Sequence, residues 1–331
     1  MSQAETPAAN KGAKSAHRGQ GRPRGRGGKP RTESTQAHNK PPLTHFIALP
    51  IGHHADLRTK ISAFTSALTS ANPAISGLDP SIIISPRRLH LTLGVMSLDQ
   101  PSPSTPPPST QSQSTEPPPA TLTRATELLH TLRPRVLEML GGEPLRVGLE
   151  RMDIMPPERG DPERAHVLWV GPDLEGEDGR RLRAVCDVIQ KTFMDAGLVV
   201  DERRELKLHC TVVNTTYRKP RTRGPRIPFS YQSIRTSEAI SSILATQPSA
   251  AQADAVAQLA DATQVLRLQD TDAASSAPDG DQSQPRRRRE KPKPLNVNLG
   301  SWSVDEMQIC RMGSYGPEGE YVAEARCSIT P

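Results

Sequence analysis

Residues 88–92 read Arg-Leu-His-Leu-Thr, and residues 207–211 read Lys-Leu-His-Cys-Thr. Apolar and β-branched residues adjoin both stretches, which favours extended strands. Side chains on a strand point alternately to its two faces, so the basic residue, the histidine and the threonine of each motif are predicted to share one face. Two strands that each present a cation, an imidazole and a hydroxyl are suited to holding a phosphate between them.

The similarity between the two halves extends to the segments before the motifs. Residues 44–50 are similar to residues 165–172, and an amphipathic helix is predicted between each of these strands and its motif. Asp56 is predicted to cap the first helix, and Gly197 to end the second. We therefore predict a duplicated strand–helix–strand unit with pseudo-twofold symmetry. Both helices carry apolar residues at i, i+4, i+7 and i+11: Leu57, Ile61, Phe64 and Leu68 in the first, and Leu182, Cys186, Ile189 and Phe193 in the second.

The composition indicates that about two-thirds of the 331 residues fold, because hydrophobic residues make up 34%, aromatic residues 3%, and 33 residues are proline. Residues 1–42 are predicted to be a disordered basic Arg/Gly tail. Residues 43–331 are predicted to form the folded domain. Two disordered insertions are predicted to interrupt it, one at 99–120 and one at 233–294.

The remaining patterns place further elements around the repeat. A helix is predicted from 121 towards 140 with a kink or break at Pro134, followed by a strand at 145–149. Alternating residues predict a hairpin whose strands are 304–312 and 321–329. The predicted fold class is α+β, with two pseudo-symmetric lobes of mainly antiparallel sheet and helices packed outside.

The net charge of +6 is concentrated at the N-terminus, where residues 1–40 hold nine Lys or Arg and two acidic residues. This distribution favours contact of the tail with RNA, or a nuclear import signal, over a basic DNA-binding domain. A second basic run, Arg286 to Arg289 followed by two lysines, is typical of an import signal or of a solvated patch. The predicted location is therefore the nucleus, the cytoplasm or both.

The four cysteines lack the spacing of a metal site, which predicts reduced thiols in the core. No stretch approaches the roughly 18 apolar residues of a membrane span, so no membrane contact is expected. The polar N-terminus argues against a secretory signal.

The repeat decides which histidines are candidates for catalysis. A single His-x-Thr motif arises readily by chance, but two copies at equivalent places of a repeat do not. His90 and His209 are therefore predicted to be catalytic, together with Thr92 and Thr211. The other repeated pair, consisting of His45 and His166, is interpreted as structural.

Substrate contacts are predicted around these four residues. Arg88 and Lys207 are candidates for binding phosphate. Among the few aromatic residues, Tyr217 is favoured as a platform on which a base stacks, because it follows the second motif closely. Trp169, Tyr231 and Tyr315 are weaker candidates for the same role.

The paired His90-Leu91-Thr92 and His209-Cys210-Thr211 motifs resemble the signatures of the two-histidine (2H) phosphoesterase superfamily. The segment 209–219, the opening strand 44–50 and residues 309–313 resemble the branch that contains A-kinase anchor protein 7 and activating signal cointegrator 1 complex subunit 1. The resemblance covers about 43–98, 121–232 and 295–330. It implies a two-lobed sheet in which the two motifs face each other across a cleft.

The resemblance implies a metal-independent phosphodiesterase with no cofactor, acting on RNA ends or oligoribonucleotides through a 2′,3′-cyclic phosphate or a 2′,5′ or 3′,5′ linkage. One imidazole would serve as general base and the other as general acid, and the residues do not decide which. Two alternatives stay open: an RNA-binding subunit of a nuclear transcription, RNA-processing or repair complex that has no catalysis, and an RNA ligase-like activity. The catalytic domain is expected to be monomeric.

The chain also departs from these relatives. Upstream of residue 43 there is no Gly-x-x-Gly segment that would match a KH RNA-binding domain. Residues 237–268 are too rich in Ala and Ser to indicate a strong kinase-anchoring helix, so kinase anchoring is not carried over.

Overall fold

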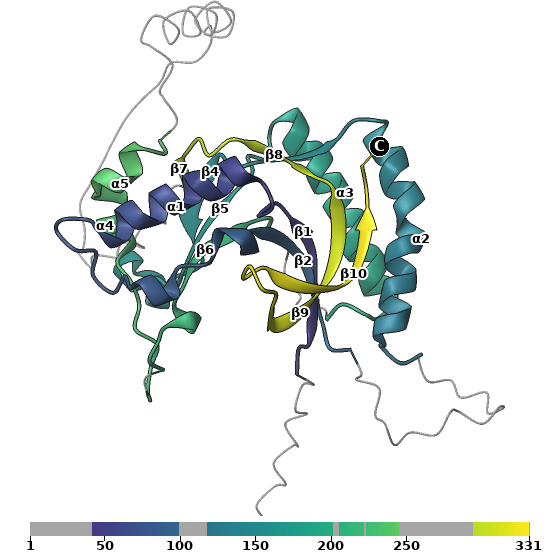
Figure 1. Cartoon of the computed structure of the whole chain (residues 1–331), viewed down its shortest axis with the longest axis horizontal. Coiled ribbons are helices and arrows are strands. Elements are labelled where there is room, and N and C mark those ends of the chain that lie inside the picture. Colours follow the sequence, from purple (N-terminus) through teal and green to yellow (C-terminus); the bar gives the residue numbers. More distant parts are fainter. Residues whose placement is uncertain (1–41, 99–117, 201–204, 222, 245–293, 331) are drawn as a thin grey trace, which may run out of the picture. The chain divides into compact units, whose positions relative to one another are not determined.

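The first strand of each predicted repeat unit forms a buried strand, because its residues are apolar on both faces. β1 (His45–Pro50) and β5 (Val167–Gly171) are buried along most of their length. In the computed structural model they pair with the motif strands β2 (His90–Met96) and β6 (Cys210–Asn214) in antiparallel register. The structure describes residues 42–98, 118–200, 205–221, 223–244 and 294–330 (Figure 1).

Each pair of repeat strands lies in its own antiparallel sheet. The first sheet has the order β10-β9-β1-β2, in which β9 (Glu306–Tyr315) and β10 (Tyr321–Ser328) form the predicted C-terminal hairpin. The second sheet has the order β6-β5-β4-β7, with β4 (Arg151–Ile154) and β7 (Leu295–Asn296). The sheets confirm an α+β fold with two similar halves of antiparallel strands.

The C-terminal part of the chain joins these halves. It supplies β7 to the second sheet and then β9 and β10 to the first. Between them, β8 (Ser301–Val304) pairs with β3 (Leu145–Gly148) in a two-stranded ribbon. The strand predicted at 145–149 is therefore confirmed, and its partner comes from more than 150 residues further along the sequence.

The amphipathic helices of the repeat are α1 (Ala55–Thr69) and α3 (Glu177–Asp195), each of which buries its predicted apolar stripe. Gly197 follows α3 with a φ of 68°, a left-handed conformation that suits glycine and ends the helix. His54, not Asp56, occupies the N-cap of α1, and Asp56 lies in the first turn. An acidic side chain there still favours the helix, because it lies near the positive end of the helix dipole.

The helix predicted from 121 towards 140 continues through its proline. α2 (Leu122–Leu140) begins at the N-cap Thr121, whose hydroxyl accepts a hydrogen bond from the Arg124 amide, and Pro134 lies inside it. Of the predicted kink or break at Pro134, the break is therefore wrong, because the helix continues to Leu140. Packing of the buried face against α3 and β10 outweighs the local cost of the proline.

The predicted tail and insertions fall mainly outside the described residues, since 1–41, 99–117 and 245–293 are not described. Residues 233–244, which the composition assigns to the start of the second insertion, contribute to two short helices. α4 (Tyr231–Thr236) and α5 (Glu238–Ser241) bury apolar side chains against the core. The ordered domain therefore extends further along the chain than the polar composition indicated.

The short 3₁₀ turns of the described residues are η1 (Pro80–Ile82), η2 (Pro86–Arg88), η3 (Glu158–Gly160), η4 (Pro162–Arg164) and η5 (Thr215–Tyr217).

One continuous hydrophobic core includes residues of both halves, among them Ile47 and Leu91 of the first sheet and Leu168 and Val212 of the second. The segment that leads into the first motif contacts the second motif strand, β6. Ile83 forms an antiparallel bridge with Val213, and the Ile84 amide donates to the Val212 carbonyl at 2.8 Å. The two His-x-Thr segments are thereby placed in neighbouring parts of one core.

Candidate functional site

A β-bulge lies opposite the threonine of each motif. In the first sheet the pairing register shifts between Ile47 and Ala48, and Ala48 pairs with Thr92. In the second sheet it shifts between Leu168 and Trp169, and Trp169 pairs with Thr211. Bulges redirect the side chains beside them, and their recurrence at equivalent positions shows that the repeat extends to the backbone of the site.

The imidazole of His90 is held by two hydrogen bonds. Its Nδ1 lies 2.6 Å from the carbonyl oxygen of Arg88, and its Nε2 lies 3.0 Å from Oγ1 of Thr92. A carbonyl oxygen only accepts, so the ring proton lies on Nδ1. In the neutral ring Nε2 then accepts from the Thr92 hydroxyl, which leaves the basic lone pair of His90 directed towards its motif partner.

The second motif repeats the first of these contacts. Nδ1 of His209 lies 2.7 Å from the carbonyl oxygen of Lys207, again two residues earlier in the chain. The neutral form of this ring therefore also carries its proton on Nδ1. In both histidines the hydrogen bond to the backbone carbonyl occupies Nδ1, so Nε2 is the nitrogen that can exchange a proton with a ligand.

The surroundings of His90 favour its neutral form. Burial, and to a smaller extent the charges of His209 and Arg88, lower its pKa to about 4, while the hydrogen bond to the Arg88 carbonyl opposes the shift. Phe46 and Tyr321 contribute to this burial, since their ring centroids lie 5.1 and 5.2 Å from that of His90. Because the charge of His209 acts on His90, the two imidazoles lie close enough to interact electrostatically.

The basic residues of the motifs lie outside regular strands, which corrects the prediction that each shares an extended strand with its histidine. Arg88 ends the 3₁₀ turn η2, and Lys207 lies in an irregular segment before β6. Both cations pack on aromatic rings. The Arg88 guanidinium lies 4.6 Å from the Tyr315 ring centroid, and Nζ of Lys207 lies 4.1 Å from that of Trp169.

Tyr217 belongs to a cluster of tyrosines beside the first motif. The Arg88 guanidinium lies 5.7 Å from its ring, and its hydroxyl oxygen lies 3.4 Å from that of Tyr321. Tyr321 is largely buried, which raises its pKa, and its ring meets His90 edge-on. Three of the four tyrosines of the chain, Tyr217, Tyr315 and Tyr321, thus gather around Arg88 and His90.

Two of the aromatic candidates are excluded as exposed stacking platforms. Tyr231 is fully buried and donates its hydroxyl proton to the Met152 carbonyl at 3.3 Å. Trp169 is 6% exposed and lies beneath Lys207. Sequence patterns do not single out Tyr321 as a site residue, because only the pairing of β10 through β9 to β1 brings it to His90.

The second repeated pair of histidines has structural contacts. His45 lies 2.8 Å from both Oγ1 of Thr44 and Oε2 of Glu324. His166 lies 2.8 Å from both Oγ1 of Thr215 and Oε1 of Glu158. Each ring is therefore fixed by a hydroxyl and a carboxylate, in agreement with the structural interpretation.

The described residues contain no cluster of three or more His, Cys, Asp or Glu side chains arranged to hold a metal ion. All four cysteines are buried free thiols, as the spacing predicted. Among the described helices, none combines the length and apolar character that a membrane span requires.

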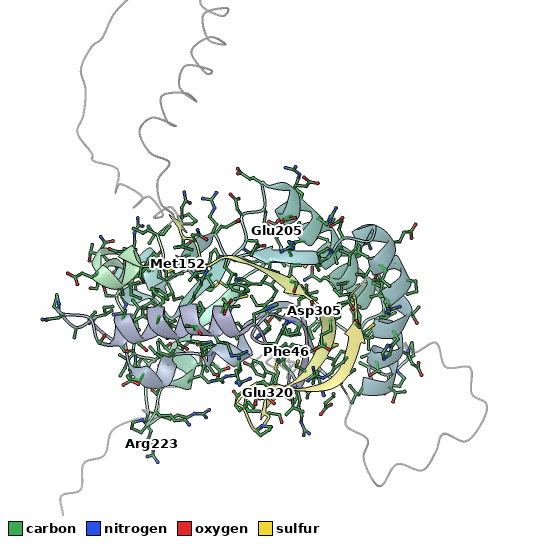
Figure 2. All side chains as sticks on the ribbon, turned by 45° about the horizontal axis from the view of Figure 1, so that its top comes forward. Phe46, Met152, Glu205, Arg223, Asp305 and Glu320 are labelled. Atoms are coloured by element: carbon green, nitrogen blue, oxygen red, sulfur yellow. The ribbon has the colours of Figure 1, made fainter. Side chains whose placement is uncertain are left out.

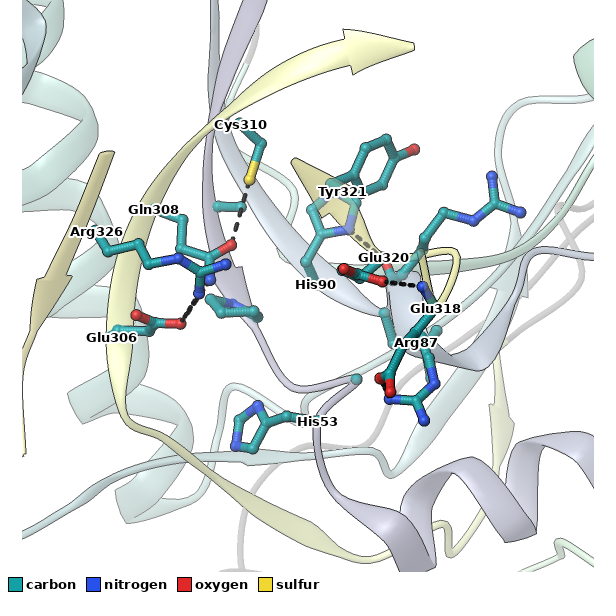
Figure 3. Close-up of a pocket in the computed structure, with 15 residues that line it drawn as sticks. His53, Arg87, His90, Glu306, Gln308, Cys310, Glu318, Glu320, Tyr321 and Arg326 are labelled. Carbon is teal, nitrogen blue, oxygen red and sulfur yellow. Dashed lines mark hydrogen bonds and ion pairs between the residues drawn. The ribbon is translucent and has the colours of Figure 1, made fainter. Parts of the chain in front are cut away.

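A pocket of about 230 Å³ opens beside the first motif on the face of the first sheet (Figure 3). His90 and Tyr321 border it on one side, and Glu306, Gln308 and Arg326 on the other. Arg88 also lines it. Glu306, Gln308 and Arg326 come from the β9–β10 hairpin, which was predicted from alternating apolar and polar residues. No local pattern places these residues near His90, which lies more than 200 positions earlier in the chain.

A basic loop follows the second motif, and the sequence reasoning did not single it out. Between 218 and 226 the described cations are Arg218, Lys219, Arg221, Arg223 and Arg226. All of them except Arg218 are exposed, and Figure 2 shows Arg223 projecting away from the folded body. The density of Arg and Lys directly after Tyr217 is the signal that could have revealed this surface.

The sequence model of the "AKAP7 2′5′ RNA ligase-like domain" matches residues 43–105 and 118–250. Activating signal cointegrator 1 complex subunit 1 of Mus musculus is 26% identical over 178 residues, which are 54% of this chain and 44% of the mouse protein. The match therefore spans less than half of that relative.

Solved structures with a similar course of the chain include Escherichia coli LigT complexed with 3′-AMP and TT0787 of Thermus thermophilus. LigT is 14% identical with a TM-score of 0.38, and the match covers 88% of this chain and 99% of LigT. TT0787 is 15% identical with a TM-score of 0.38, covering 87% of this chain and 98% of TT0787.

The lowered pKa of His90 predicts how acid destabilises the fold. The unfolded chain takes up a proton at the ordinary pKa of 6.5, whereas the folded protein resists protonation of His90 until about pH 4. The unfolded state therefore binds more protons within that window, and the contribution of His90 to the free energy of unfolding falls by roughly 3 kcal/mol between pH 6.5 and pH 4. Replacement by asparagine should remove this component, as measured by denaturant unfolding at pH 7 and pH 4.

The control is His130→Asn, because His130 is exposed on α2. That variant should lose as much stability on acidification as the natural protein. An equal loss in His90→Asn would show that His90 does not resist protonation in the folded state.

Proposed function

The chain belongs to the AKAP7 2′5′ RNA ligase-like domain family of two-histidine phosphoesterases, and we propose that it hydrolyses phosphodiesters at RNA ends or in oligoribonucleotides. The observation that carries this proposal is the matched pair His90 and His209, each with Nδ1 held by the carbonyl two residues earlier. Such a pair can act on opposite sides of one phosphorus without a metal ion.

We assign the general base to His90, because its low pKa keeps it neutral at physiological pH. Nε2 of His90 takes a proton from water, or from a ribose hydroxyl, as that oxygen forms its bond to phosphorus. His209, protonated on both nitrogens, gives its Nε2 proton to the oxygen whose bond to phosphorus breaks. Transfer of one proton back through solvent restores both rings for the next turnover.

The remaining motif residues would stabilise the charge on the phosphate. Thr92 and Thr211 lie beside the bulges, from which their hydroxyls can donate to the non-bridging oxygens. Arg88 and Lys207 add positive charge, and their packing on aromatic rings restricts where that charge lies. In the unliganded protein the Thr92 hydroxyl bonds His90, so a bound phosphate would compete for this donor.

The exposed cations of the 218–226 loop support a strand of RNA as substrate over an isolated mononucleotide. They follow Tyr217, which lies beside Arg88 of the first motif, so a strand leaving the site could continue along them. Lys and Arg side chains neutralise backbone phosphates irrespective of sequence. A 2′,3′-cyclic phosphate end and a 2′,5′ or 3′,5′ linkage all fit this arrangement.

A second role as a subunit of a larger complex is favoured by one comparison. The similar mouse protein is named as a subunit of the activating signal cointegrator 1 complex. We propose nuclear assembly with protein partners for this chain as well. The basic segments 1–42 and 286–293, on which the prediction of nuclear location rests, lie outside the described residues apart from residue 42.

His90→Ala and His209→Ala should each lower kcat/KM on the preferred substrate by about 10²–10⁴, because each removes one proton-transfer group. The measurement is turnover of 2′,3′-cyclic nucleotides and of 2′,5′- and 3′,5′-linked dinucleotides. His130→Ala, which changes an exposed histidine on α2, should retain full activity.

An active double His90/His209 variant would show the mechanism to be wrong. Binding of the substrates without any product would favour the alternative that the protein is a non-catalytic RNA-binding subunit. Joined product from a cyclic phosphate end and a 5′-hydroxyl end would favour the ligase-like alternative.

The basic loop is tested by replacing Lys219, Arg221 and Arg223 together with alanine. Affinity for a single-stranded RNA dodecamer should fall, and the slope of log K against log salt should decrease by about 2, since each lost phosphate contact removes about 0.7. Fluorescence anisotropy at several salt concentrations measures both quantities. The control replaces three exposed cations of α2 and α3, namely Arg135, Arg180 and Lys191. An equal decrease in RNA affinity and in the salt slope for this control would contradict a specific role for the loop.

A further inference from the structure

The pocket beside His90 has a wall that the proposed proton transfers do not use. Figure 3 shows Glu306 and Arg326 on the side opposite to His90 and Tyr321. Small and apolar residues, including Ala48 and Pro50, contribute to its lining. A pocket of about 230 Å³ with apolar sheet residues and an aromatic edge in its lining has room for one planar ring system.

The charges of this lining argue against a second phosphate. Three arginines border the pocket, Arg87, Arg88 and Arg326, but so do three glutamates, Glu306, Glu318 and Glu320. Arg87 forms an ion pair with Glu318, and Arg326 forms one with Glu306 at 2.7 Å. Burial and the neighbouring His54 lower the pKa of His53, against the opposing effect of Asp305 at 3.2 Å, and so favour the neutral form of this ring. A neutral ligand rich in hydrogen-bonding groups fits this balance better than an anion does.

The wall opposite His90 is an ordered network of donors and acceptors. Oε1 of Glu306 accepts from Nε2 of Gln308 at 2.6 Å and from Nη1 of Arg326 at 2.7 Å. Oε1 of Gln308 in turn accepts from the Cys310 thiol at 3.3 Å. These bonds fix the carboxylate while using only one of its oxygens. None of the described residues donates a hydrogen bond to Oε2 of Glu306, so this oxygen can accept from a ligand.

Both charged groups of the wall remain accessible from the pocket. The side chain of Glu306 is 27% exposed and that of Arg326 is 54% exposed. A carboxylate oxygen has two acceptor positions, and a guanidinium has five N–H donors, of which one is used here. The wall therefore offers two acceptor positions beside several donors, and the hydrogen bonds of the network restrict how these groups move.

We propose that this pocket binds the guanine base of a nucleotide whose phosphate lies at His90, an inference that rests on the proposed function of that site. The Watson–Crick edge of guanine presents two adjacent donors, N1–H and the 2-amino group, and next to them the acceptor O6. The donors match Oε2 of Glu306, and O6 matches the Arg326 guanidinium. Adenine presents an acceptor where guanine has N1–H, and that acceptor would face the carboxylate.

The test is calorimetric titration of the full chain with the four ribonucleoside 3′-monophosphates. 3′-GMP should bind roughly tenfold or more tightly than 3′-AMP, 3′-CMP or 3′-UMP, since one well-formed pair of base contacts gives discrimination of this order. Glu306→Gln should bring 3′-GMP to within a few-fold of the other three. Glu127→Gln, the same chemical change on the exposed side of α2, should leave the preference intact.

A thermal unfolding curve of each variant shows whether it folds, and Arg326→Gln provides a second variant that should also reduce the preference. Equal affinity for the four nucleotides, absence of binding, or a guanine preference that survives in Glu306→Gln would overturn the inference. Turnover measured in parallel keeps the two proposals apart. Guanine-selective binding without turnover would overturn the phosphodiesterase alone, and turnover with unselective binding would overturn the guanine pocket alone.

Discussion

The hydrogen bond from Nδ1 of each motif histidine to the carbonyl two residues earlier is the constraint on which the site depends. It joins His90 to Arg88 at 2.6 Å and His209 to Lys207 at 2.7 Å. A carbonyl can turn towards the ring in this way only where the backbone departs from a regular strand. The 3₁₀ turn before β2 and the irregular segment before β6 provide that departure, so both segments orient the histidine rings.

The pairing of distant strands places the remaining groups around the histidine that this hydrogen bond orients. β9 and β10 come from the end of the described chain, yet they pair beside β1 and bring Tyr321 to 5.2 Å from the His90 ring centroid. The same hairpin carries Glu306 and Arg326 to the far wall of the neighbouring pocket. The C-terminal segment therefore both covers part of the His90 imidazole, which favours its neutral form, and shapes the space beside it.

The sequence was informative wherever a local pattern has one structural solution. The repeat, the apolar stripes of α1 and α3 and the alternating hairpin followed from periodicity. The paired motifs made His90 and His209 the candidates for catalysis, and that role stays a prediction. Where tertiary packing competes with local preference, the prediction of a boundary was wrong. The helix does not break at Pro134, and residues 233–244 pack on the core despite their polar neighbours. The wall formed by Glu306 could not be predicted, because it depends on which strands pair across the sheet.

Long-range ¹H–¹⁵N correlation spectra of the histidine rings, recorded during titration with inorganic phosphate, test most directly whether one phosphate contacts both imidazoles. The account predicts that the Nε2 signals of His90 and His209 shift along a single binding isotherm, while both rings carry Nδ1–H when neutral. The rings of His45 and His166, which are bonded to carboxylates, should not respond. A motif histidine whose signal is unchanged at saturating phosphate would contradict the account.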